Sequence, residues 1–451
     1  MDFVISLLRG IIGIALILFI ALLMSNNKKK INWKLVGSGL LIQLIFAIFI
    51  LKGNELGNFF SPLGWPKIFF SWISSFFVII LNFTTEGAKF VFGSLAISPG
   101  QEGSLGFFFV FQVLPTIIFF ASLMSILYYL GIMQRIVQGM AWIMAKLMGT
   151  SGAESLSCSA NIFVGQTEAP LMIRPYLKDM TNSELLTIMT GGMATIAGGV
   201  MAAYIQMLGD SYAQSLGLPL NDARLLFATH LLGASVMAAP AAIVISKIIF
   251  PETEEPVTKG SVKVKIERNQ ANVIEAAAAG ASDGVSLAIN VAGMLIAFIA
   301  LIALINYLLV YIGDISGLNS IIRSSYNSEL SLQFLFGLIL QAIAIGIGVP
   351  IQDAMNFGSL VGIKISLNEF VAYLEMSKLI SEKVLVNPKS ILMATYALCG
   401  FANFSSIAIQ IGGLSPLAPN RRSDLAKLGL KAVFAGTLAT LLTATLAGIL
   451  F

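Results

Sequence analysis

The sequence predicts an all-α membrane protein that crosses the bilayer several times. Of its 451 residues, 57% are hydrophobic and only 11% are charged, and the mean hydropathy is +0.87. Soluble domains carry roughly a quarter charged residues, so this composition excludes an ordinary soluble enzyme and a disordered scaffold. A bilayer core of about 30 Å needs roughly 20 apolar residues per helical crossing, and the chain has room for about eight to ten.

Eight apolar runs are long enough to cross the bilayer. They are residues 3–24, 33–52, 107–131, 185–208, 225–250, 285–311, 391–413 and 428–451. The first run lacks a preceding basic segment and a small-residue cleavage pattern, so we expect it to remain as a span. Two further stretches, 66–81 and 133–149, combine apolar residues with tryptophan and basic residues, which is typical of helices that lie in the membrane interface.

Basic residues predict the orientation, because Lys and Arg are retained on the cytoplasmic side. Lys28, Lys29, Lys30 and Lys34 follow the first span, which places the N-terminus outside, and eight crossings place the C-terminus outside as well. The other basic residues predicted to lie inside are Arg135, Lys146, Arg174, Lys178, Lys259, Lys263, Lys265, Arg268, Arg421, Arg422 and Lys427. Three disagree and fall outside, namely Lys378, Lys383 and Lys389. The scheme requires residues 155–176 and 347–376 to enter the membrane and return on the same side.

The charged stretch 251–269 (PETEEPVTKGSVKVKIERN) divides the chain into two similar halves. Each half, 107–250 and 285–451, contains a span, an amphipathic or short apolar helix, a polar-tipped hairpin, an interrupted span and a final span. The two re-entrant hairpins start from opposite faces, which is the pattern of inverted repeats in secondary transporters.

Two carboxylates lie where charge is least tolerated. Glu168 lies in NIFVGQTEAP (161–170), and Glu369 follows Asn368 in LNEFVAY (367–373). A carboxylate in hydrocarbon costs at least about 2.5–3.5 kcal/mol, so one that is retained there usually faces a cavity, a partner or a substrate. The alternative for each is a helix-capping carboxylate that binds amides of its own chain.

The interrupted spans contain small and polar residues in place of a continuous apolar face. They are TGGMATIAGGV (190–200) and ALCGFANFSSIAIQIGG (397–413). Unwound backbone is tolerated at membrane depth only where it lines a cavity or is buried in protein, and its freed carbonyls can coordinate a cation. Close packing of small residues is the alternative, but it explains the glycines and leaves Asn403, Ser405 and Ser406 unexplained.

The polar groups at depth favour an uncharged, hydroxyl-rich ligand. Carboxylates and amides bind hydroxyls and base edges, and no basic cluster is expected beside them, which disfavours a phosphorylated substrate. The chain has 27 basic and 23 acidic residues, and this small excess of positive charge gives no reason to expect a nucleic-acid partner. One histidine, His230, and two separate cysteines supply no metal cluster and no nucleophile–base pair, so we do not expect an enzyme.

Five segments resemble the concentrative nucleoside transporter family, in the family's order and across residues 84–450. They are GQTEAPLMIRPYL, MTGGMATIAGGVMAAY, EAAAAGASDGVSLAINVAGML, LNEFVAYLEM and YALCGFANFSSIAIQIGG. The resemblance implies a homotrimer in the cytoplasmic (inner) membrane. It implies a scaffold in 1–148 and 273–330, a mobile transport domain in 150–250 and 331–451, and a cytoplasmic linker over 251–272.

The resemblance also implies the site and its ligands. The nucleobase site falls on Gly165, Gln166, Thr167 and Glu168, with Val200 nearby, and the ribose site on Glu369, Asn403 and Ser406, with Phe401 beside them. The sodium site of the family corresponds to Asn161, Val164, Thr195 and Ile196. The implied function is sodium-driven import of nucleosides of the uridine, cytidine and adenosine class by an elevator movement, without a further cofactor. A proton-coupled permease for nucleosides or another polar solute remains the alternative.

Overall fold

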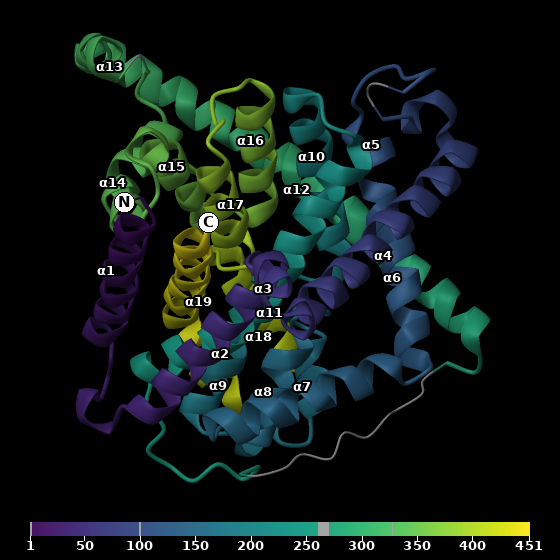
Figure 1. Cartoon of the computed structure of the whole chain (residues 1–451), viewed down its shortest axis with the longest axis vertical. Coiled ribbons are helices and arrows are strands. Elements are labelled where there is room, and N and C mark those ends of the chain that lie inside the picture. The colour runs from purple at the N-terminus through teal and green to yellow at the C-terminus, as the bar shows by residue number, and fades with distance from the viewer. Residues whose placement is uncertain (1, 99–100, 260–269, 327) are drawn as a thin grey trace.

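The computed structural model describes residues 2–98, 101–259, 270–326 and 328–451 (Figure 1). Every regular element in these residues is helical, apart from one isolated β-bridge between Ser151 and Lys259. The predicted all-α fold is therefore confirmed.

Eight helical segments of the described chain are long and apolar enough to cross a membrane. The helices that make them up are α1 (Asp2–Leu23), α2 (Trp33–Leu51), α4 (Ser61–Phe92), α5 (Phe109–Gln112) with α6 (Leu114–Tyr129), α9 (Asn182–Ala194) with α10 (Gly198–Leu216), α11 (Leu220–Ile249), α12 (Val273–Ile315) and α19 (Arg422–Leu450). The number agrees with the prediction, but the set differs. Helix α4 is among the eight although it was not predicted to cross the membrane. The predicted span 391–413 is not among them, because it is divided into α17 (Pro388–Leu398) and α18 (Phe404–Leu414).

The prediction of a short interfacial helix over 66–81 is wrong in its extent, because α4 has 32 residues. Its second half contains polar residues that lower the hydropathy without ending the helix. The Thr84 and Thr85 hydroxyls donate to the carbonyls of Ile80 and Leu81 at 2.9 and 3.0 Å, so their polar groups are satisfied within the helix itself.

Helix α7 (Ile132–Met148) matches the predicted amphipathic segment 133–149. It begins and ends at glycines with left-handed backbone, Gly131 at φ 74° and Gly149 at φ 70°. One face carries exposed Trp142, and the other buries Val137 in the core.

Helix α12 is longer than predicted and starts at Val273, 12 residues before the expected 285. Asn272 caps it by accepting from the Glu275 amide at 2.9 Å, and the alanine-rich start has high helix propensity. Gly284 lets α12 approach α6 closely, since a Cβ there would lie 2.7 Å from Cα of Ile118.

Two hairpins occur where polar-tipped re-entrant segments were predicted. The first consists of α8 (Gly152–Ala160), a tip over 161–168, and a return limb of short 3₁₀ helices, η3 (Ala169–Ile173) and η4 (Leu177–Asp179). The second consists of α15 (Ala354–Ser366) and α16 (Glu369–Ser381), joined by a two-residue turn, and α14 (Leu332–Gly346) packs against α15. The second hairpin thus starts later than 347.

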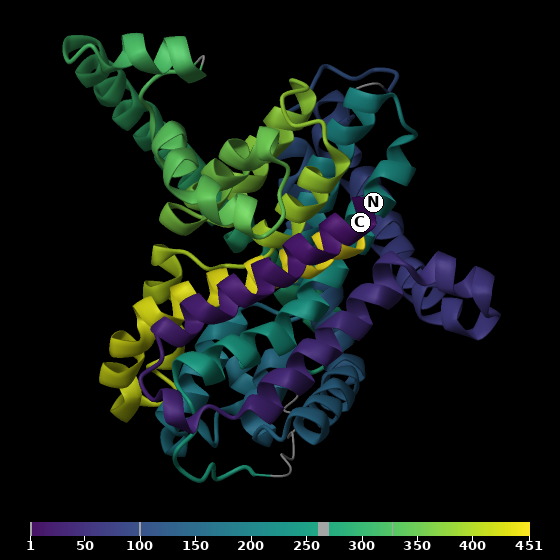
Figure 2. The ribbon, with the colours of Figure 1, turned by 60° about the vertical axis from the view of Figure 1, so that its left-hand side comes forward.

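The two ends of the chain lie beside each other (Figure 2). Helices α1 and α19 pack together, and the Ser6 hydroxyl donates to the Gly448 carbonyl at 3.2 Å and accepts from Lys389 at 2.8 Å. Just beyond the other end of α1, the backbone amide of Asn26 donates to the Ile249 carbonyl at 3.0 Å. Three of the basic residues predicted to lie inside, Lys263, Lys265 and Arg268, fall outside the described residues.

Candidate functional site

The two hairpin tips and the two helix breaks meet at one cavity of about 200 Å³. Its lining includes all nine residues predicted to bind a nucleoside: Gly165, Gln166, Thr167, Glu168, Val200, Glu369, Phe401, Asn403 and Ser406. Residues separated by up to 241 positions in the chain are therefore assembled at one site.

Gln166 connects the first tip to the second interrupted helix. Its Nε2 donates to Oγ of Ser406 at 3.1 Å, and its Oε1 accepts from Nε2 of Gln410 at 3.0 Å. Gln410 also donates to the Met189 carbonyl at 2.9 Å. This approach requires glycine at 192, because a Cβ there would lie 2.8 Å from both Gln166 and Gln410.

Glu369 is held by side chains from two other elements. Its Oε1 accepts from the Tyr204 hydroxyl at 3.0 Å, and its Oε2 accepts from Nδ2 of Asn403 at 3.2 Å. The N-cap of α16 is Asn368, whose Oδ1 accepts from the Val371 amide at 2.9 Å. Asn368 is therefore the capping side chain of α16, and the buried carboxylate of Glu369 lines the cavity.

Asn403 sits at the start of α18, directly after the second break. Its Oδ1 caps the helix by accepting from the Ser406 amide at 2.9 Å and from the Ser405 hydroxyl at 2.7 Å. Its Nδ2 remains available for Glu369, so one side chain both begins the half-helix and orients the carboxylate.

Glu168 is the most accessible polar group of the first tip. It precedes η3 but makes no capping hydrogen bond. Its carboxylate folds over Gly165, because a Cβ at that position would lie 2.1 Å from Oε2 of Glu168. Glycine at 165 therefore leaves room for the carboxylate beside the cavity.

One wall of the cavity is apolar and belongs to a different part of the fold. Helix α12 contributes Leu287, Val291, Met294 and Leu295, which share one face, and Val200 and Phe401 extend the apolar lining. Polar groups on one side and hydrocarbon on the other suit a ligand with a polar edge and a flat apolar face.

A second, larger cavity of about 930 Å³ lies further along the same helices. It uses the next turns of α12, around Ile299 and Asn306, and the continuation of α10 and α16 at Gln214 and Lys378. Glu375 also lines it, without a hydrogen bond or ion pair among the described residues. Helix α16 runs from the smaller cavity into this one.

The four predicted sodium ligands lie around the end of α8 and the first break. Asn161 is buried, and its Nδ2 donates to the Ser157 carbonyl at 3.0 Å, while its Oδ1 has no partner in the described structure. Thr195 ends α9 with extended backbone, and Ile196 follows it within the break. The Gly198 amide donates to the Phe163 carbonyl at 3.0 Å, which holds the break against the tip that contains Val164.

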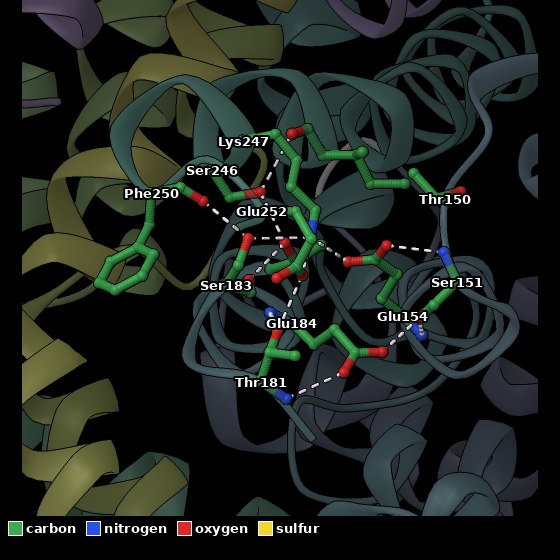
Figure 3. Close-up of polar contacts among 12 residues, drawn as sticks. Thr150, Ser151, Glu154, Thr181, Ser183, Glu184, Ser246, Lys247, Phe250 and Glu252 are labelled. Atoms are coloured by element: carbon green, nitrogen blue, oxygen red, sulfur yellow. Dashed lines mark hydrogen bonds and ion pairs between the residues drawn. The ribbon is translucent and has the colours of Figure 1, made fainter. Parts of the chain in front are cut away.

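A buried polar network fixes the base of the first hairpin (Figure 3). Ser151 and Glu154 form a capping box at the start of α8, and Thr181 and Glu184 form another at the start of α9. The boxes are joined by the Ser151 hydroxyl, which donates to Glu184 at 2.5 Å.

Lys247 of α11 completes this network. Its Nζ lies 2.8 Å from Oε2 of Glu154 and 3.2 Å from Oε2 of Glu252, and it donates to the Ser183 hydroxyl at 3.0 Å. The network joins α8, α9, α11 and the start of the linker, so the base of the first hairpin is held from several directions.

Sequence reasoning missed three residues of this region. Tyr204 and Gln410 complete the hydrogen bonds of Glu369 and Gln166, and Lys364 lies fully buried in the second hairpin. Gln410 and Lys364 are polar residues inside apolar runs, IAIQIGG and GIKIS, and this pattern was a usable signal. Tyr204 gives no such local signal in an alanine- and methionine-rich helix.

Comparisons with known proteins agree along the whole chain. The profile of the Na+ dependent nucleoside transporter N-terminus matches residues 12–95, the nucleoside recognition (Gate) profile matches 110–211, and that of the Na+ dependent nucleoside transporter C-terminus matches 230–448. The chain is 45% identical to an uncharacterized transporter of Haemophilus influenzae over 98% of both chains. It is 40% identical to sodium/nucleoside cotransporter 1 of Rattus norvegicus, over 97% of this chain and 63% of the longer rat chain.

The fold is similar to structures of CNTnw. The inward-facing substrate-bound state matches with a TM-score of 0.83 at 39% identity, covering 98% of both chains. A CNTnw variant in an outward-facing state matches with a TM-score of 0.84 at 38% identity, covering 99% of this chain and 98% of that one. The chain is therefore a member of the Na+-dependent, or concentrative, nucleoside transporter family, and is a transporter and not an enzyme.

Proposed function

We propose that the protein is a sodium-coupled nucleoside symporter that imports nucleosides by alternating access. The observation that carries the proposal is the 200 Å³ cavity, in which two hairpin tips and two helix breaks present carboxylate, amide and hydroxyl groups together. These groups match the donors and acceptors of an uncharged nucleoside, and no lysine or arginine lines the cavity to bind a phosphate.

The polar groups divide into two sets that suit the two parts of a nucleoside. Gln166, Thr167 and Glu168 at the first tip face the base edge, and Glu369 and Asn403 bind the ribose hydroxyls. Ser406 completes the ribose set, and Phe401 offers a ring face. The volume is below the roughly 300–1,000 Å³ of common ligand pockets, so binding requires the cavity to widen. The apolar α12 wall is the surface that separates from the tips.

Sodium binding at the first break would couple the ion to the nucleoside. Asn161 brings a buried, unpartnered Oδ1, and Val164, Thr195 and Ile196 add backbone and hydroxyl oxygens, which are suitable ligands for a hard cation. An ion there orders the segment that leads directly into the first tip. Nucleoside affinity then rises with sodium, and sodium affinity rises with nucleoside by the same factor.

The movement that exposes the site to each side is an elevator displacement of 150–250 and 331–451 against a scaffold drawn from 1–148 and 273–330. The first two spans, α1 and α2, were expected in the scaffold, but we propose that they move with the transport domain, because they pack on α19 and α11. Gln43 of α2 is buried and donates to the Met237 carbonyl of α11 at 3.0 Å. The scaffold is then built from α4, α6 and α12 of three subunits in a homotrimer.

The protein is placed in the cytoplasmic (inner) membrane with both termini outside. The basic residues that follow the first span, Lys28, Lys29, Lys30 and Lys34, support this orientation, because Lys and Arg are retained on the cytoplasmic side. The 930 Å³ cavity then opens toward the outside and forms the entry route for the nucleoside.

Uptake into proteoliposomes tests the proposal. We expect an inward sodium gradient to drive accumulation of radiolabelled uridine, and excess unlabelled cytidine or adenosine to compete. Uridine accumulation that is driven by a proton gradient and does not depend on sodium would establish the proton-coupled alternative. If no unlabelled nucleoside competes with radiolabelled uridine for uptake, the proposed substrate class is wrong.

A further inference from the structure

Lys364 is a fully buried cation in the second hairpin. It lies in the last turn of α15, three residues before the turn at Leu367. Its Nζ donates to the carbonyl of Ala397 and to Oγ1 of Thr440, each at 2.9 Å. No carboxylate of the described residues lies within ion-pair distance of it, although Glu369 attracts it from farther away, and it does not line the 200 Å³ cavity. Lysine is rarely buried without a pairing partner, so this position needs a reason.

The contacts of Lys364 join three elements of the second repeat. They are the first limb of the hairpin (α15), the half-helix that ends at the second break (α17) and the last helix (α19). The corresponding elements of the first repeat are α8, α9 and α11. There, the proposed sodium ligands lie at the end of α8, at Asn161, and at the break that follows α9, at Thr195.

Both half-helices end in the buried interior, with terminal carbonyls that lack a helical partner. The C-terminal end of a helix carries a partial negative charge and attracts cations. In secondary transporters such ends commonly coordinate the coupling ion. Ala397 lies in the last turn of α17, two residues before the break, and the ammonium of Lys364 meets its carbonyl.

The two breaks are in direct contact. Gly400, inside the second break, lies so close to the end of α9 that a Cβ there would be 2.7 Å from the Met193 carbonyl and 3.0 Å from the Ala194 carbonyl. A change in the geometry of one break is therefore transmitted to the other through packed backbone.

We propose that the Lys364 ammonium is a fixed cation that holds the carbonyl end of α17 at the second break. The coupling sodium has the same effect at the first break. The second repeat then needs no exchangeable ion, and one sodium suffices for each nucleoside. This inference rests on the proposed function. By holding the end of α17, Lys364 positions Phe401 and Asn403, which follow within the break.

Sodium-dependent uridine binding to the purified protein, measured by titration calorimetry, tests the ion count. For the unaltered protein we expect the logarithm of uridine affinity to rise with the logarithm of sodium concentration, below saturation, with a slope of about one. A slope of two shows a second exchangeable ion and overturns the inference. Uridine affinity that is independent of sodium overturns the proposed function instead.

Substitutions of Lys364 separate charge from hydrogen bonding. K364M removes both, K364Q keeps hydrogen-bond donors without charge, and K364R keeps the charge. At saturating sodium we expect uridine affinity to fall by about tenfold in K364M and K364Q, with K364R closer to the unaltered protein. Unaltered affinity in K364Q, or equal losses in K364Q and K364R, shows that the charge has no role.

A second measurement does not depend on uridine. Cys399 caps α17 at the second break and is 1% exposed, so its reaction with a maleimide reports opening of that break. In a C158S background, we expect K364M to be labelled several-fold faster than the parent and K364R. Equal rates contradict the inference. If K364M does not fold, T440V removes one of the two hydrogen bonds and is expected to raise the labelling rate more modestly; no increase in T440V contradicts it as well.

Discussion

Nδ2 of Asn403 donates to Oε2 of Glu369 across 3.2 Å and so joins the second hairpin tip to the second helix break. The asparagine is fixed at its other end by capping α18, and the carboxylate is fixed at its other oxygen by Tyr204. Glu369 also lines the cavity, so a ligand bound there can reach its carboxylate.

Replacing Glu369 by glutamine is expected to weaken uridine affinity by about 10–100-fold. Hydrogen bonds to a charged group contribute about 1.5–3 kcal/mol, and the amide accepts through only one atom. Calorimetry at saturating sodium measures the loss. Tyr204→Phe is the matched control, because it removes one partner of Glu369 but leaves the charge, and we expect a smaller loss. Equal affinity of Glu369→Gln and the unaltered protein would remove Glu369 from the site.

Replacing Gln166 by alanine is expected to change the order of preference among nucleosides more than the affinity for ribose. Its amide faces the cavity beside Thr167, where the base edge is proposed to bind. Competition of uridine, cytidine and adenosine against labelled uridine measures the preference. Gln410→Ala serves as the control, since Gln410 supports Gln166 without lining the cavity. An unchanged preference order in Gln166→Ala argues against base recognition by this tip.

Thr195→Val is expected to raise the sodium concentration needed for half-maximal uptake by about tenfold, because the loss of one favourable polar contact is worth roughly 1 kcal/mol or more. Uridine affinity at saturating sodium should change little. Thr190→Val is a useful comparison, as it removes a nearby buried hydroxyl in α9 that is not among the proposed ligands. Similar sodium dependence in both variants would place the ion elsewhere.

Lys247→Met is expected to destabilise the protein by about 3–5 kcal/mol, because it leaves Glu154 and Glu252 without their cation. Thermal denaturation of the purified protein in detergent measures the effect. Adding Glu154→Gln to this variant removes one of the uncompensated charges and should recover part of the loss. If the double variant is no more stable than Lys247→Met, the ion pair seen at the base of the first hairpin contributes little.

The elements that carry function were predictable from the sequence for a physical reason. Gly, Asn and Ser inside apolar runs are costly for a continuous helix, so TIAGG and GFANFSS both marked breaks that the structure contains. Glu168 and Glu369 were found in the same way, as charges in apolar surroundings, and the structure brings both to one cavity.

The extents of long helices were predicted less well. Helix α4 continues past Leu81 because threonine hydroxyls bond to the preceding turn, and α12 starts at Val273 because alanines stay helical without being strongly apolar. Neither effect is visible in hydropathy. The partners of Lys247 and Lys364 depend on contacts between distant segments, which a single sequence does not specify.

If α1 and α2 move with the proposed transport domain, they give that domain its own surface toward lipid. Leu8, Ile12 and Phe19 of α1 are exposed, while its opposite face packs on α19. An elevator movement would therefore carry an apolar belt across the thickness of the bilayer, and mismatch between the belt and the hydrocarbon costs energy at either end of the travel. Under that movement, the acyl-chain length of the surrounding lipid would set the transport rate through residues that never contact a nucleoside or an ion.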